Sequence, residues 1–171
     1  LRDELHLSEL FLGKLHFFER DYKKSADLLK QAVEAQPDNA ECRFWLGLAL
    51  LRSGDARSAI EHLDRAAQLR DDPEFLKVLG EAEYQMRRWE DAIPHLEQAL
   101  SKGVPKREET AILLAKAQAR SGRRAEARGT LEELVRRNPY SANAISELVE
   151  MYLDDGDYAR AVGICEEGLR A

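Results

Sequence analysis

The sequence lacks the marks of several protein classes. Its two cysteines, Cys42 and Cys165, lie far apart and show neither CxxC nor Cys/His spacing, which argues against a disulfide scaffold and against a zinc site. No apolar run approaches the ~20 residues of a membrane-spanning helix. The signatures GxSxG, HExxH, GxGxxG and GxxxxGK(S/T) do not occur. We therefore expect a soluble protein of the cytoplasm or periplasm that is not an enzyme and uses no cofactor and no metal.

A large excess of basic charge is also missing. The formal net charge is -6, and 44% hydrophobic with 34% charged residues is too apolar a balance for a disordered chain. Arginine and lysine outnumber the acids between residues 102 and 137, but no aromatic residues lie among them on which bases could stack. This pattern argues against nucleic acid as the partner.

What the sequence does have is an internal repeat. Four sets of residues recur with the same successive steps of 34, 33, 35 and 34 residues. The sets are Leu12, Leu46, Leu79, Leu114, Leu148; Gly13, Gly47, Gly80, Ala115, Val149; Ser25, Ala59, Ala92, Ala127, Ala161; and Ala32, Ala66, Ala99, Leu134, Gly168. Because all four agree, we expect a single domain over residues 1–171 made of five units, at about 6–39, 40–72, 73–107, 108–141 and 142–171.

Each unit holds two helical patterns separated by a turn. Gly54 follows the first pattern of unit two, and glycine there can stop a helix by taking the left-handed conformation. Small residues such as Gly47 and Ala59 allow the two helix backbones of a unit to approach closely. The sequence therefore predicts ten helices in antiparallel pairs and no strand, with first helices near residues 6–19, 40–53, 73–86, 108–121 and 142–155.

These units resemble the tetratricopeptide repeat family. The resemblance covers the chain from about His6 to its end and rests on the leucine–glycine pairs, the recurrent alanine, Asp21-Tyr22, Asp157-Tyr158, and the closing prolines Pro37 and Pro139. It implies an all-α fold, a right-handed α-solenoid of about five helix-turn-helix repeats whose first helices line a concave surface. It also implies binding of another protein or peptide, without identifying that partner, because a fold does not fix a function.

The first helices of units one and two carry a second apolar stripe. In unit two we assign Leu46 and Gly47 to the contact with the unit's own second helix, while another stripe recurs at helical spacing on roughly the opposite side. A helix that is apolar on nearly all sides is either buried twice or awaits a partner. With the same positions of the neighbouring units, this stripe predicts a groove that is apolar at its N-terminal end: Leu10, Lys14, Phe17, Phe18, Phe44, Leu48, Leu51, Lys77, Glu81 and Tyr84.

We therefore expect a protein–protein interaction scaffold that binds an apolar or amphipathic peptide or helix in the groove of the N-terminal units. An upstream segment or a second copy of the chain could cover the same stripe instead. A carboxylate clamp of the chaperone type is not expected, because Lys14 faces leucines and acids. Two other functions stay open: a structural spacer or oligomerisation region of a larger assembly, of the secretion or polysaccharide-export type, and an accessory domain of an enzyme outside this chain.

The ends of the solenoid carry apolar residues that no further unit covers. These are Val162, Cys165 and Leu169 on the last helix, and Leu1, Leu5 and Leu7 at the start. Because solenoid units bury their faces on one another, we expect either a fragment of a longer chain or self-association through exposed ends.

Two pairs of polar residues also invite interpretation. Cys165 replaces a leucine of the earlier units, which predicts burial, whereas Cys42 is expected to be more exposed. His62 and His95 share one register in adjacent units, but two ligands do not make a metal site, so we interpret them as a coincidence of the repeat.

Overall fold

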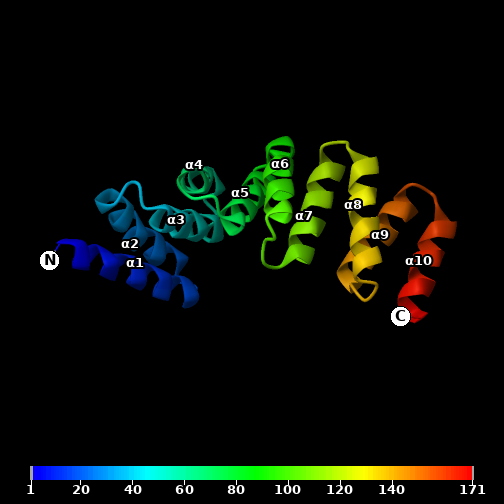
Figure 1. Cartoon of the computed structure of the whole chain (residues 1–171), viewed down its shortest axis with the longest axis horizontal. Helices are drawn as coiled ribbons and strands as arrows, with labels where there is room; N and C mark the ends of the chain where they lie inside the picture. Colours follow the sequence, from blue (N-terminus) through cyan, green and yellow to red (C-terminus); the bar gives the residue numbers. More distant parts are fainter. Residues whose placement is uncertain (1, 171) are drawn as a thin grey trace.

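The computed structural model describes residues 2–170 and the side chains of residues 8–168. Within this range the chain forms ten helices and no strand, in a single row along the long axis (Figure 1). The helices are α1 (Arg2–Phe18), α2 (Tyr22–Ala35), α3 (Ala40–Ser53), α4 (Ala56–Leu69), α5 (Pro73–Gln85), α6 (Trp89–Ser101), α7 (Arg107–Arg120), α8 (Arg124–Arg137), α9 (Ala142–Asp154) and α10 (Tyr158–Arg170). The helical solenoid is confirmed, and among the first helices only α1 departs clearly from its predicted start.

Capping residues and left-handed residues set the turns. Asn39 and Asp55 each accept a hydrogen bond from a backbone N–H in the first turn of the helix that follows. Gly54 ends α3 in the left-handed conformation, at φ 95°. At the same register Arg20 and Arg87 are also left-handed, at φ 64° and 58°. The sequence pattern did not show this, because an arginine carries no signal for a conformation that usually selects glycine.

Within a unit, glycine brings the two helices together. A Cβ atom added at Gly47 would lie 2.6 Å from Cγ of Leu63 and 3.2 Å from the carbonyl oxygen of Ala59, both in α4. Ala59 is fully buried, so the small residues lie at the predicted helix contact. The same glycine–leucine contact recurs in units one and three, between Gly13 and Leu29 and between Gly80 and Leu96.

Between units, the leucine of each leucine–glycine pair faces backward along the chain. Leu46 packs in one cluster with Leu29, Ala32 and Val33 of α2, in the preceding unit. Its assignment to its own second helix was therefore wrong, because the leucine and the glycine, adjacent in sequence, point toward different neighbours. Each of the later units repeats this contact with its own leucine, so every junction buries the first helix of one unit on the second helix of the unit before.

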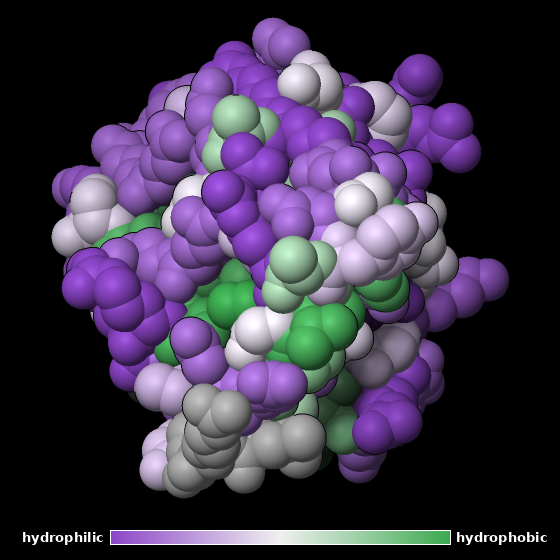
Figure 2. Space-filling view, turned by 90° about the vertical axis from the view of Figure 1, so that its right-hand side faces the viewer, coloured by the Kyte–Doolittle hydropathy of each residue, from purple (hydrophilic) through white to green (hydrophobic). Residues whose placement is uncertain are grey.

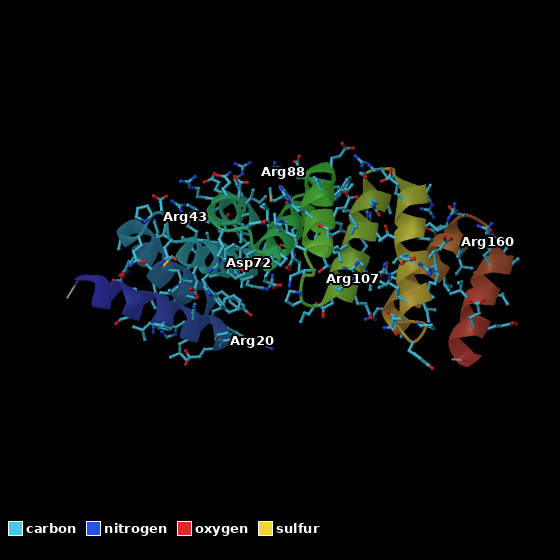
Figure 3. All side chains as sticks on the ribbon, in the orientation of Figure 1. Arg20, Arg43, Asp72, Arg88, Arg107 and Arg160 are labelled. Carbon is cyan, nitrogen blue, oxygen red and sulfur yellow. The ribbon has the colours of Figure 1, made fainter. Side chains whose placement is uncertain are left out.

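Consecutive helices run in opposite directions between the two edges of the solenoid. Arg88, just before α6, and Arg107, at the start of α7, lie on opposite edges of the solenoid, so these two helices run antiparallel (Figure 3). The join between them carries two left-handed residues, Gly103 and Lys106. Val104 between these two is buried and packs against Leu76 of the preceding first helix. The longest join of the repeat is thus fixed to the core by a single apolar side chain.

Both expectations for the cysteines were wrong. Cys42 is buried, because its position on α3 faces α2, and burial raises the pKa of its thiol. Cys165 is exposed, because among the described elements α10 contacts only α9. The register of Cys165 is buried only where a following unit covers it.

Candidate interaction groove

The first helices of adjacent units touch one another along the whole solenoid. Between α3, α5, α7 and α9 this surface holds three hollows of about 290, 400 and 560 Å³. The first and second share Glu109 and Leu113, and the second and third share Lys116 and Glu147, so neighbouring hollows adjoin one another. We call the surface that they form the first-helix groove.

The expected apolar end of the groove is not open. Leu10, Phe44, Leu48 and Leu51 are all buried inside the chain, so the expectation that they form an exposed stripe was wrong. Phe44 stacks on the ring of Phe75 in α5, with ring centroids 4.3 Å apart. The apolar stripe of Phe44, Leu48 and Leu51, which was expected to bind a partner, instead packs in the contact between adjacent first helices.

The aromatic residues of unit one lie between the core and the surface. Phe17 is half-buried and Phe18 is exposed, and the rings of both lie edge-on to Trp45 of α3 at 5.5 and 5.8 Å. The ammonium group of Lys14 lies over the Trp45 ring, 5.2 Å from its centroid, and forms an ion pair with Glu41. Lys14 is thus held by its own chain, and Phe18 is the expected groove residue of this unit with the most free surface.

The remaining expected residues do reach the groove. Lys77 and Glu81 line the first hollow, and Tyr84 lines the third. Glu81 accepts hydrogen bonds from Arg52 of α3, at 2.8 and 3.3 Å, which joins adjacent first helices. Whether these three residues bind a partner stays a prediction.

The C-terminal part of the groove holds residues that were not expected as a site. The second hollow is lined by α7 and α9: Glu109, Ile112, Leu113, Lys116, Asn143, Ser146 and Glu147. Lys116 and Glu147 form an ion pair of 2.5 Å across it. Ile112 and Lys116 occupy the registers of Phe44 and Leu48, so the repeat register by itself places them on the inner side of their first helix. The groove therefore presents an apolar floor with a charged rim.

Side-chain size at one register explains which part of the groove is open. Phe75 lies at the start of α5 and fills the space beside Phe44. At the same register the later units have the smaller Thr110 and Ala144. Thr110 lines the first hollow, and the second hollow is lined by Asn143 and Ser146, on either side of the buried Ala144 in sequence. Between the first helices of units two and three, the Phe75 ring fills this space. The smaller residues of the later units leave the equivalent space unfilled.

The two histidines of equal register have opposite surroundings. His95 Nδ1 lies 2.7 Å from a carboxylate oxygen of buried Glu83, and this hydrogen bond raises the pKa of His95. In unit two the register of Glu83 carries Leu50, and burial lowers the pKa of His62. One register thus carries two histidines whose pKa values shift in opposite directions.

Among the described residues, no group of three or more histidine, cysteine, aspartate or glutamate side chains could hold a metal ion. A search of the same residues found no helix long and apolar enough to cross a membrane.

Two family models match the chain. One, described as "Anaphase-promoting complex, cyclosome, subunit 3", matches residues 19–99, and one described as "Tetratricopeptide repeat" matches residues 83–143. A curated relative, the BBSome complex member BBS4 of Bos taurus, is 37% identical over 68 residues, which are 37% of this chain. The chain spans only 13% of that relative's length.

Several solved structures share the fold. A crystal structure of MamA protein superposes with a TM-score of 0.87 at 21% identity, covering 98% of this chain and 92% of the other. MamA 41-end from Desulfovibrio magneticus RS-1 gives 0.86 at 16% identity, with 99% and 94% covered. YrrB, described as a TPR protein with an unusual peptide-binding site, gives 0.80 at 14% identity, with 95% and 84% covered. At these identities the likeness concerns the fold alone.

Proposed function

Because this chain belongs to the tetratricopeptide repeat family, we propose that it is a protein–protein interaction scaffold that holds an amphipathic segment of a partner in the first-helix groove. The observation that carries the proposal is the row of three adjoining hollows between α3 and α9. Binding sites are concave and combine an apolar floor with a few polar groups that fix orientation. The second hollow has this composition.

The side chains of the groove indicate what kind of segment it would take. Ile112 and Leu113 offer an apolar floor, and Asn143 and Ser146 offer polar groups to the backbone of a bound segment. The rim carries both charge signs, from Lys116 and from acids on α7 and α9. The partner segment we propose therefore alternates apolar with charged residues and inserts an apolar side chain into the second hollow.

We therefore propose a site further along the chain than the one expected from the sequence. Phe44 and Leu48 are buried in the contact between α3 and α5. The open surface therefore lies on units three to five rather than on units one and two. The relatives support the general proposal. YrrB is described by its peptide-binding site, and the curated relative is a member of a complex. We also infer that the chain is a binding module rather than a catalyst, because no catalytic signature occurs in it.

Selection from a displayed peptide library, followed by affinity measurement on purified protein, tests this function. Lys116→Glu reverses a charge on the rim and should weaken binding of the selected peptides about tenfold or more, since like charges then face one another beside Glu147. Lys30→Glu makes the same charge change on an exposed position of α2, outside the groove, and should leave binding unchanged. Equal losses in both variants, or none in either, would contradict the proposal.

A further inference from the structure

The charged side chains that line the third hollow differ in whether their own chain pairs them. Seen from the C-terminal end, most of the molecule is hydrophilic, with a band of apolar residues between (Figure 2). On such a surface a binding site is distinguished by charges that lack a partner rather than by charge as such. In the third hollow, Lys116 pairs with Glu147, and Arg124 pairs with Asp154. These four side chains are therefore held within the chain.

The other two charged residues of this lining, Arg120 and Glu150, are not held in this way. Arg120 lies in the last turn of α7 and Glu150 lies on α9, and both are exposed. Neither forms an ion pair with any other side chain in the described part of the chain. The third hollow therefore has an open guanidinium group on one wall and an open carboxylate on the other.

The repeat shows what the same two residues do when they meet. Arg52 and Glu81 occupy the registers of Arg120 and Glu150 at the junction of units two and three. There Arg52 donates two hydrogen bonds to the Glu81 carboxylate, at 2.8 and 3.3 Å. At the junction of units four and five, the same residue types flank a hollow of about 560 Å³ without joining. Arg120 thus lacks the carboxylate that its register has two units earlier.

The second and third hollows follow one another between α7 and α9. Earlier residues of both helices line the second hollow, later residues line the third, and Lys116 and Glu147 belong to both. Ile112, Lys116 and Arg120 lie about one turn apart on one face of α7. Along the helix axis, Arg120 is about 12 Å from Ile112, at about 1.5 Å per residue. A segment whose apolar side chain enters the second hollow therefore brings neighbouring residues beside Arg120 and Glu150.

From these contacts we infer that the partner segment carries an acidic side chain that pairs with Arg120, and that Arg120 selects the partner for it. A planar guanidinium group matches a carboxylate with two parallel hydrogen bonds, as Arg52 and Glu81 show within the chain. Glu150 on the opposite wall disfavours a second acid and favours a basic residue in its place. The inference rests on the proposed function, because it names the chemistry of the partner in the same groove.

Peptides selected on wild-type protein from the displayed library test this inference. They should carry Asp or Glu at one fixed spacing from the apolar residue, about four residues if extended or about eight if helical. Arg120→Glu should weaken their binding about tenfold or more, since two carboxylates then face each other. Selection on this variant should yield Lys or Arg at the same position. Arg57→Glu makes the same change on an exposed position of α4, outside the groove, and should leave binding unchanged.

A double variant separates recognition of the partner from pairing within the chain. Arg120→Glu combined with Glu150→Lys exchanges the two charges of the third hollow. If Arg120 and Glu150 paired with each other in the complex, this exchange would restore binding of the original peptides. We expect instead that the double variant binds the original peptides about tenfold or more weakly than wild type does, and that it binds peptides in which the acidic residue is replaced by Lys.

Three results would overturn the inference: selected peptides without an acidic residue at a fixed spacing, unchanged affinity in Arg120→Glu, or full binding of the original peptides by the double variant. If Lys116→Glu weakens binding and Arg120→Glu does not, only this inference fails and the proposed function stands. A library that yields no binder, or binders that Lys116→Glu does not affect, overturns both. Circular dichroism checks that each variant is folded, and Arg120→Gln replaces Arg120→Glu if the latter is not.

Discussion

The seam between units two and three and the seam between units four and five use the same registers with opposite results. In the first, Phe44 of α3 stacks on Phe75 of α5, and the space between the first helices is core. In the second, Ile112 of α7 lines an open hollow, and the register of Phe75 carries the smaller Ala144 on α9. The backbone repeats, but the side chain at one register decides whether two helices enclose a closed core or an open pocket.

The same contrast holds for the two histidines. His62 and His95 occupy one register, yet the pKa of one falls and the pKa of the other rises. The hydrogen bond with Glu83 raises the pKa of His95, whereas burial disfavours the charged form of His62 and lowers its pKa. A repeat therefore supplies equivalent positions, and the neighbours assign them different properties.

The largest expected effect comes from breaking the closed seam. Phe44→Ala should lower the free energy of unfolding by about 3–5 kcal/mol, because it removes a buried ring and leaves a cavity against Phe75. Ile112→Ala, at the same register of the open seam, should lower it by much less, since Ile112 is only half-buried. Urea unfolding followed by circular dichroism measures both values. Similar losses in the two variants would show that the seams do not differ as described.

A smaller effect is expected at the close approach within a unit. Gly47→Ala forces a Cβ atom against Leu63, which is fully buried and cannot move aside, so it should destabilise the fold by about 1–3 kcal/mol. Unit four already has Ala115 at this register. Gly129→Ala in α8 is the control, since no atom lies within 4 Å of the added group, and it should stabilise the fold by about 0.5–1 kcal/mol. Melting temperatures that move in the same direction would count against this packing.

The smallest effect concerns pH. Because the folded-state pKa of His95 is raised, its pairing with Glu83 contributes stability that is fully present below about pH 6.5 and is lost as pH rises through the folded-state pKa. The stability difference between wild type and His95→Gln should therefore shrink between mildly acidic and alkaline pH. An NMR titration should place His95 above the ordinary histidine pKa and His62 below it. The reverse order would contradict the assigned contacts.

Much of the fold could be predicted from the sequence, and less of the candidate site. The four matching registers predicted the helix pairs, because they include small residues such as Gly47 and Ala59, which mark the positions where two helices pack closely. The groove was misplaced for a physical reason. An apolar stripe such as Phe44, Leu48 and Leu51 has the same spacing whether it packs on a neighbouring helix or faces solvent, so periodicity alone cannot separate the two.

The sequence by itself therefore determined the repeat, the helix pairs and the resemblance to a family, since these follow from local spacing and from small residues at fixed positions. Only the tertiary structure decided that Phe44 is core, that Ile112 borders a hollow, and that Cys165 rather than Cys42 is exposed. The physical reason is that the burial of a side chain depends on two surfaces, the one that carries it and the one that packs against it. A residue's own position fixes which way it faces, but the neighbouring unit, or its absence, fixes whether anything covers it.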